Sequence, residues 1–246
     1  MCLFYNNCEE IISFFASTSD PMQVTCLVSG GKDSIFALGL ALLQFEVTSI
    51  ITIRSSCDES QLFHLPNCQH VQLIAEMLDI PHQFAWIDSC DVEEEIQGLT
   101  NALIKAKAEA VITGGIRSEF QRYKFNLSAH RAGMRCFNPL WRLAPQQLML
   151  ELLDHNFHII LTAIAGMGLE KDLLGAKLTS KILDRLKNTA YGNEIAITGE
   201  GGSYESFVLD APFFPARILI KDSIVHWDRY REEGYLEILR VETEQK

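Results

Sequence analysis

Long apolar runs are missing from this chain of 246 residues. No stretch approaches the roughly 18 uninterrupted apolar residues that a membrane-spanning helix needs, which argues against a membrane partner. Internal repeats, low-complexity linkers and coiled-coil heptads are absent too. Apolar residues make up 48% of the chain and charged residues 22%, an ordinary balance for a globular protein. The length therefore predicts one large domain or two small ones with a full core.

Paired cysteines and an excess of positive charge are also missing. The seven cysteines are scattered, odd in number and without a C-x-x-C pair, which favours reduced thiols in a cytoplasmic protein. Lys and Arg number 21 against 32 Asp and Glu, a net charge of −11, which argues against nucleic acid as a partner. An acidic surface is compatible with a cationic substrate or a basic protein, although it often serves only solubility. Cys57, His64, Cys68 and His70 match no common zinc spacing.

The most informative segment follows a short apolar run at 24–28. It reads Ser-Gly-Gly-Lys-Asp-Ser at 29–34, and helix-compatible residues continue from Ile35 to about Gln44. A buried strand that runs through a glycine turn into a helix predicts a phosphate site, because unpaired N–H groups and the positive end of the helix dipole face the anion. The alternative is a glycine–serine turn that only caps a core helix. The segment lacks the glycine of a Walker A loop and the G-x-G-x-x-G of a Rossmann fold.

The residue types of this loop suit nucleotide phosphates. Gly30 and Gly31 let the backbone approach an oxyanion where a side chain would collide. Ser29 and Ser34 add hydroxyl donors, and Lys32 adds a mobile positive charge. Asp33 is a candidate ligand for the Mg²⁺ that accompanies nucleotide phosphates. The sequence therefore predicts that the chain binds a nucleotide.

The first half alternates strands with helices. β-Branched or apolar runs at 47–54, 82–87 and 110–113 predict three further strands, and helices are expected at 67–78, with Asn67 as N-cap, and from Asp88 or Asp91 to about 108. Three consecutive glutamates at 93–95 are expected on a solvated face. The alternation predicts a parallel, doubly wound α/β sheet with its ligand at the carboxyl ends of the strands. If the first and fourth strands are neighbours, Gly114 and Gly115 border the same nucleotide crevice as the loop at 29–34. Ile53 is a further candidate contact for the nucleotide.

A second, smaller mixed α/β domain is expected beyond residue 125. It contains a strand around Phe137, a helix at 145–154, strands at 157–165 and 194–198, a helix at 179–190, and antiparallel strands in the alternating tail at 217–241. The expected organisation is a leader at 1–21, an ATP-binding domain at 22–125 and a substrate-binding domain at 126–246. The leader is either a short added helix or a mis-assigned start, because it lacks the basic region of a signal peptide.

A second glycine-rich block at 199–206 carries two carboxylates, Glu200 and Glu205. Glycines that free the backbone beside carboxylates suit a site that binds a cation or handles protons. The alternative is a tight turn with two solvated glutamates.

Together these blocks resemble one family, the diphthine–ammonia ligases of the N-type ATP pyrophosphatase (PP-loop) superfamily. The resemblance covers nearly everything from 22 to about 214. After the loop at 29–34, the blocks follow in the family's order at 63–67, 75–76, 80–81, 118–122, 139–141, 168–170, 199–206 and 209–214. Two positions depart from the family's pattern: Ser203 stands in place of a second glutamate, and Ala176 in place of a basic residue.

The resemblance implies a PP-loop (adenine nucleotide alpha hydrolase-like) sheet with a second domain, and amide formation on the diphthine of elongation factor 2. ATP with Mg²⁺ would adenylate the diphthine carboxylate, pyrophosphate would leave, and ammonia would displace AMP. Alternatives are adenylation of another carboxylate or carbonyl acceptor, on a small molecule or an RNA base, and a nucleotide-binding module without turnover.

The expected site divides into three groups. The expected catalytic residues are Lys32, Asp33, Glu200 and Glu205, with Glu205 as the base that takes a proton from ammonia. ATP is expected to contact Ser29, Gly30, Gly31, Lys32, Asp33, Ser34, Ile53, Gly114 and Gly115, with Asp33 on the metal. The expected substrate contacts are Glu119, Gln121, Arg122, Trp141, Gly201, Gly202 and Tyr204, since aromatic faces and carboxylates suit the trimethylammonium group of diphthine and an arginine suits phosphate or carboxylate.

Overall fold

The computed structural model describes residues 21–55, 67–193 and 195–246. Nearly all of the expected leader and most of the family block at 63–67 lie outside these residues, as do Cys57 and His64. No helix in the described ranges is long and apolar enough to cross a membrane.

The first domain is built on a five-stranded parallel sheet in the order β3-β2-β1-β4-β5. Its strands are β1 (Gln23–Leu27), β2 (Glu46–Ser55), β3 (His82–Ile87), β4 (Ala110–Ile112) and β5 (Arg135–Phe137). Four of the five residues of β1 are buried, as expected for a central strand covered on both faces. The predicted parallel sheet is confirmed, and β1 pairs directly with β4.

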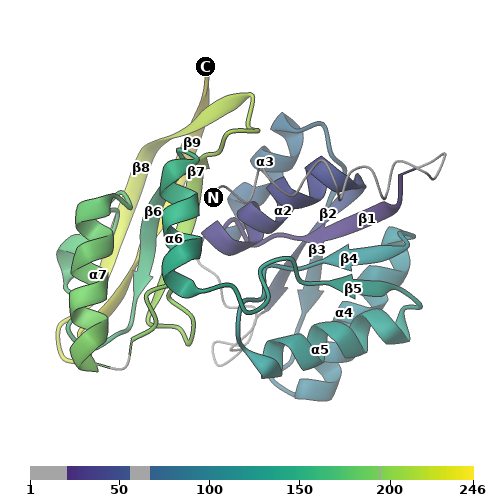
Figure 1. The fold of residues 1–246 in the computed structure, drawn as a ribbon, viewed down its shortest axis with the longest axis horizontal. Coiled ribbons are helices and arrows are strands. Elements are labelled where there is room, and N and C mark those ends of the chain that lie inside the picture. The colour runs from purple at the N-terminus through teal and green to yellow at the C-terminus, as the bar shows by residue number, and fades with distance from the viewer. Residues whose placement is uncertain (1–20, 56–66, 194) are drawn as a thin grey trace.

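Helices cover both faces of this sheet (Figure 1). One face carries α2 (Lys32–Gln44) and α3 (Val71–Met77), and the other carries α4 (Val92–Ala106) and α5 (Glu119–Arg131). Asp91 is the N-cap of α4, because its side chain accepts from the backbone N–H groups of Glu93 and Glu94.

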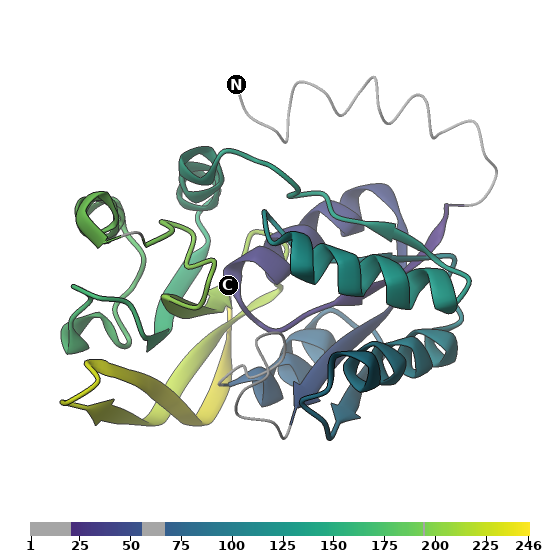
Figure 2. The ribbon, with the colours of Figure 1, turned by 90° about the horizontal axis from the view of Figure 1, so that it is seen from below.

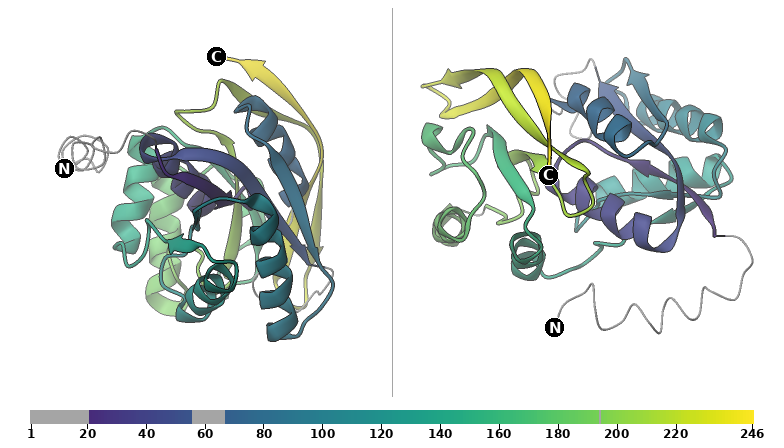
Figure 3. Two further views of the ribbon diagram at one scale, coloured as in Figure 1. Left: turned by 90° about the vertical axis from the view of Figure 1, so that its right-hand side faces the viewer. Right: turned by 90° about the horizontal axis from the view of Figure 1, so that it is seen from above.

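The second domain is a four-stranded antiparallel sheet in the order β7-β6-β9-β8. Its strands are β6 (His158–Ile164), β7 (Tyr204–Asp210), β8 (Ala216–Asp228) and β9 (Glu233–Gln245), accompanied by α6 (Pro145–Asp154) and α7 (Ser180–Asn193). Figures 2 and 3 show this sheet beside the first domain, with β7 next to the N-terminal end of α2. One apolar core runs from the first sheet into the second; Phe36 of α2 and Phe157 beside β6, for example, make an edge-to-face contact at 5.7 Å. The two sheets therefore hold each other in place.

Two strand predictions are wrong. The strand around Phe137 pairs with β4 and belongs to the first sheet rather than the second unit. The strand expected at 194–198 is irregular backbone where described, because Tyr204 donates its hydroxyl hydrogen to the Ile197 carbonyl and this segment packs as a loop.

Two side-chain predictions in the first domain are also wrong. Asn67 stands at the predicted position before the 3-10 turn Cys68–His70 that leads into α3, but its side chain does not cap this turn: it donates to the Leu236 carbonyl and accepts from the Ile238 N–H of β9. Glu95 is not on a solvated face, because it is buried and accepts from the Lys124 ammonium at 2.6 Å. In both cases a hydrogen-bond partner distant in sequence, rather than the local sequence pattern, decides where the side chain lies.

The described cysteines give a mixed result. Cys26, Cys68 and Cys136 carry free thiols, as predicted. Cys90 forms a disulfide, so the prediction of reduced thiols is wrong at that position.

Candidate functional site

The loop between β1 and α2 folds back on itself through its serines. Ser34 Oγ lies 3.1 Å from Ser29 Oγ, accepts from the Ser29 N–H at 3.2 Å and donates to the Gly31 carbonyl at 3.0 Å. Gly31 precedes the first residue of α2 and has no side chain to cap it, whereas the N–H of Lys32 at this helix end donates to Ser206 Oγ at 3.2 Å. Two hydroxyls and the N-terminus of α2 therefore meet at one point, which is an anion-binding arrangement.

Gly30 is the position in this loop where glycine is required. Its φ is +87°, and an added Cβ would lie 2.6 Å from the ring of Phe207 on β7. Its carbonyl also accepts from Val208 N–H at 3.0 Å. The turn of the loop is thus fixed by contact with the second domain.

Lys32 links the first domain to the second, whereas the sequence predicts a mobile positive charge at this position. Its ammonium is buried, lies 2.8 Å from Asp33 Oδ2 and donates to the Thr198 carbonyl. Its backbone N–H donates to Ser206 Oγ at 3.2 Å. Burial opposes its charge, but the Asp33 carboxylate, together with Tyr204 and Glu205, outweighs burial and raises the pKa of Lys32.

Asp33 has an oxygen that no described group satisfies. Oδ2 is paired with Lys32, whereas Oδ1 is buried and has no hydrogen-bond partner in the described parts of the chain. Burial raises the pKa of Asp33 against the lowering effect of Lys32, and Glu200 adds to the rise. A free carboxylate oxygen beside a phosphate-type loop is a donor that suits Mg²⁺.

The turn after β4 packs against the loop between β1 and α2. A Cβ on Gly114 would lie 2.8 Å from the backbone of Asp33 and Ser34, so only glycine lets the two turns approach this closely. Gly115 N–H points to Thr113 Oγ1 at 3.5 Å. The expected neighbourhood of these two loops is confirmed by the pairing of β1 with β4.

The second domain closes the site with residues 198–206, which we call the strap. Gly199, Gly201 and Gly202 all have positive φ, between 77° and 89°. Glu200 Oε1 accepts from the N–H groups of Arg117 and Ser118 at 2.7 and 2.8 Å. The strap therefore reaches across to the beginning of α5 as well as to Lys32.

Glu205 and Tyr204 face the loop from β7. Burial raises the pKa of Glu205 to about 7; Lys32 opposes this rise and Asp33 adds to it. Burial likewise raises the pKa of Tyr204 to about 12, and its hydroxyl donates to the Ile197 carbonyl at 2.6 Å. A carboxyl that titrates near neutral pH is suited to proton transfer.

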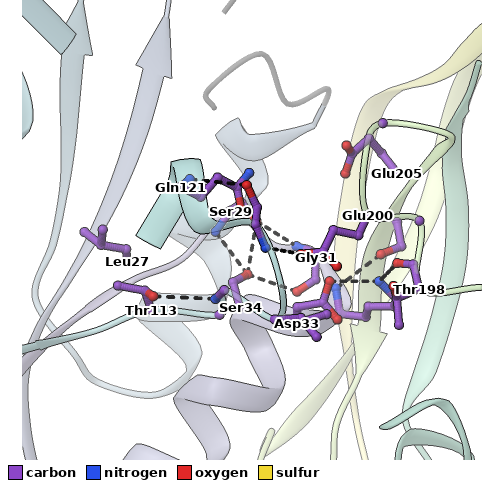
Figure 4. A pocket seen from close by; sticks show the side chains of 18 of the residues that line it. Leu27, Ser29, Gly31, Asp33, Ser34, Thr113, Gln121, Thr198, Glu200 and Glu205 are labelled. Carbon is purple, nitrogen blue, oxygen red and sulfur yellow. Dashed lines mark hydrogen bonds and ion pairs between the residues drawn. The ribbon is translucent and has the colours of Figure 1, made fainter. Parts of the chain in front are cut away.

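These elements enclose one cavity of about 450 Å³, within the usual range for ligand sites. Figure 4 shows Ser29, Asp33 and Ser34 on the loop side and Thr198, Glu200 and Glu205 on the strap side. The predicted site residues that line the cavity are Ser29, Gly31, Lys32, Asp33, Ser34, Ile53, Gly114, Gly115, Gln121, Glu200, Gly201, Gly202, Tyr204 and Glu205.

Four predicted residues do not line this cavity. Gly30 turns its backbone toward β7, as described above. Glu119 and Arg122 pair with each other at 3.2 Å on α5, and the Arg122 guanidinium lies 4.8 Å from the ring centre of Trp141. These three side chains form a separate surface cluster beside the beginning of α5.

Sequence reasoning missed the apolar end of the cavity and part of its polar wall. The lining also includes Leu27, Val28, Ile51, Thr113, Ile116, Ser118, Phe120, Phe125, Thr198, Gly199 and Ser206. Leu27 follows from its place at the carboxyl end of β1, where ligands are expected, and Ile51 is its partner on β2. Phe125 carries no sequence signal, because only the packing of α5 turns it toward the cavity. Among the described residues, no group of three or more His, Cys, Asp or Glu side chains is arranged as a metal site.

Comparison with known proteins matches both halves of the chain. The family "Diphthamide synthase N-terminal domain" matches residues 22–136, and "Diphthamide synthase C-terminal domain" matches 144–243. A diphthine–ammonia ligase of Danio rerio is 28% identical over 92% of this chain and 98% of its own length. One of Schizosaccharomyces pombe is 30% identical over 88% of this chain and 39% of its own.

A solved structure, described as a predicted subunit of tRNA methyltransferase from Methanocaldococcus jannaschii, aligns over 77% of this chain and 99% of that chain. Its TM-score is 0.40 at 16% identity, and this likeness carries no functional argument.

Proposed function

Because the chain belongs to the diphthamide synthase family across both of its domains, we propose that it is a diphthine–ammonia ligase, an ATP-dependent enzyme that forms a carbon–nitrogen bond. The observation that carries the proposal is the shared cavity. A phosphate-type loop from the first domain and a strap with two glutamates from the second line the same space. Nucleotide binding alone would not require the second wall.

ATP fits this cavity in one direction. Leu27, Ile51, Ile53 and Phe125 provide an apolar end for the adenine ring. Ser29, Ser34 and the N-terminal end of α2 provide donors for the phosphates. The reacting α-phosphate would then lie between the loop and the strap.

Asp33 is the residue that would hold Mg²⁺, because its Oδ1 is buried without a partner. When bound there, Mg²⁺ would neutralise charge on the phosphates. Lys32 has a different task, since its ammonium already joins Asp33 to the Thr198 carbonyl. It orients the Asp33 carboxylate and ties the two walls of the cavity together.

The chemistry proceeds in two displacements. An oxygen of the diphthine carboxylate attacks the α-phosphorus of ATP, and pyrophosphate leaves with the electrons of the broken bond. Ammonia then attacks the acyl carbon, a proton leaves its nitrogen, and AMP departs with the electrons of the acyl–oxygen bond. Glu205 is suited to take that proton, because burial holds its pKa at about 7 and its ionised form is abundant at neutral pH.

The protein substrate is elongation factor 2 carrying diphthine, with ammonia as the second substrate, and the reaction belongs to the cytoplasm. Gln121, Gly201, Gly202 and Tyr204 line the cavity and are placed to meet the diphthine side chain. The surface cluster of Glu119, Arg122 and Trp141 lies beside this wall, where it would contact polypeptide around diphthine. Ser203 and Ala176, the two departures from the family's pattern, do not line the cavity.

The test combines the protein with Mg-ATP, isotope-labelled ammonium and diphthine-bearing elongation factor 2. We expect one AMP for each labelled amide on the modified histidine, and no AMP without the acceptor. Asp33→Asn should lower AMP formation by at least about 100-fold, because the carboxylate no longer holds the metal. The matched control is Asp184→Asn, an exposed aspartate on α7. AMP formation without any amide would refute the assignment.

A further inference from the structure

The strap is attached to the first domain at two points that are close in sequence. The Lys32 ammonium holds the Thr198 carbonyl, and the N–H groups before α5 hold Glu200 Oε1. Between them stands Gly199, whose added Cβ would lie 2.5 Å from the Tyr204 carbonyl oxygen. The strap therefore spans the cavity from the beginning of α2 to the beginning of α5.

The attachment at Glu200 is chemically strong. Two backbone N–H groups converge on one carboxylate oxygen at 2.7 and 2.8 Å, within the range of charge-assisted hydrogen bonds. These donors belong to Arg117 and Ser118, at the positive end of the α5 dipole, and Ser118 Oγ accepts from Gln121 N–H. Glu200 thereby completes the cap of this helix from the other domain.

The conformation of the strap depends on such anchors. Gly201 and Gly202 have positive φ, and an added Cβ would meet nothing within 4 Å at either position. No described atom therefore lies where their side chains would pack, and glycines lose more conformational freedom on ordering than other residues. Without Glu200, the segment that follows would lose its tie to α5, whose residues Phe120 and Gln121 line the cavity.

The same contact limits what Glu200 can do in catalysis. Oε1 accepts two hydrogen bonds from backbone groups that cannot move away without opening the cavity. The Glu205 side chain makes no such contact with the described residues, and its pKa is influenced by the charges of Lys32 and Asp33. The two glutamates of the strap therefore have different tasks.

Resting on the proposed ligase function, we propose that Glu200 is a positioning residue: it clasps the strap to the beginning of α5 and keeps water from the acyl-adenylate. Water that reaches the acyl-adenylate adds to the acyl carbon, restores the carboxylate and releases AMP without forming an amide. The ratio of AMP released to amide formed therefore measures how well the strap closes the site.

Three substitutions separate a clasp from a proton carrier. Glu200→Gln keeps an oxygen acceptor at the same distance from the backbone but cannot carry a proton. If Glu200 only positions the strap, this variant should keep an AMP-to-amide ratio near one. Its ATP dissociation constant should rise by about fivefold, the difference between a charged and a neutral acceptor. Glu200→Asp is shorter by one methylene and Glu200→Ala lacks the acceptor. Both should raise the ratio at least about threefold and weaken ATP binding about tenfold.

The pH dependence provides an independent readout. The glutamine substitution should leave the rise of the rate with pH unchanged, because the titrating base is a different glutamate. The control is Glu94→Ala, an exposed first-turn residue of α4, which should keep a ratio near one.

The inference is overturned if Glu200→Gln abolishes amide formation while Glu200→Asp retains it, the pattern of a general base. It is also overturned if all three substitutions keep a ratio near one. Should Glu200→Ala fail to fold, the glutamine and aspartate substitutions still decide between the two roles. Failure of the unsubstituted protein to form amide would instead count against the proposed function.

Discussion

Replacing Glu205 by glutamine tests whether this half-buried carboxyl, which the charge of Lys32 influences, is the base of the reaction. The pKa of Glu205 is raised to about 7 from 4.5, chiefly by burial. At neutral pH about half of the molecules then carry the ionised form that can accept a proton. Glutamine occupies the same volume but cannot take a proton, so the rate of amide formation should fall by about 100-fold or more.

The same shift predicts a stability effect with a definite sign. A carboxyl whose pKa is higher in the folded than in the unfolded state stabilises the fold below the unfolded value of 4.5. This contribution is lost as the pH rises from 4.5 through about 7, because the folded protein must then bury the ionised form. A shift of this size corresponds to at most about 3 kcal/mol, and we expect about 1.5 kcal/mol since the side chain is partly solvated.

The assay compares unsubstituted protein and Glu205→Gln over the pH range from 5 to 9. The rate ratio between the two proteins removes the titration of ammonium, which both share. This ratio should rise through pH 7 and then level. Urea unfolding of the ATP-free proteins should show the unsubstituted protein losing stability relative to the variant over the same range. Glu244→Gln on β9 is the matched control, because its side chain is exposed.

Parallel pH–rate curves for the two proteins would refute the role of Glu205 as base. Parallel pH–stability curves would refute the raised pKa itself. A low but pH-dependent rate in the glutamine variant would show that another group takes the proton.

Two further predictions concern stability. Gly30→Ala should lower the free energy of unfolding by about 3 kcal/mol, because it combines positive φ with a collision against a buried ring on β7. Gly133→Ala tests the positive φ alone, since φ is +74° and no described atom lies within 4 Å of its added Cβ. It should lower the free energy of unfolding, measured by urea titration for both variants, by only about 1 kcal/mol. Lys124→Met should cost about 3 kcal/mol by thermal unfolding, because the buried Glu95 carboxylate loses its ammonium partner. Lys105→Met, exposed on α4, should cost less than about 0.5 kcal/mol; equal losses at both lysines would contradict the importance of the buried pair.

Local sequence was enough for the elements whose physics is local. The loop at 29–34 needs only a buried strand, two glycines and a following helix, and all three can be recognised within about twenty residues of the chain. The parallel sheet and the neighbourhood of Gly114 with that loop follow from alternating strands and helices together with the rule for strand ends. One of the family's blocks further along the chain, at 199–206, lies in the strap that lines the other side of the cavity.

Only the tertiary structure decided which role each polar side chain has. Asn67 and Glu95 follow ordinary helix patterns, yet partners far away in sequence bind them. Lys32 looks like a mobile phosphate ligand until the fold brings the Thr198 carbonyl to its ammonium. The sequence favours Glu205 over Glu200 as the base, but it does not show that Glu200 accepts from the N–H groups before α5. Their difference lies in burial and in contact with α5, and a linear pattern cannot encode either, since both depend on how two sheets pack against each other.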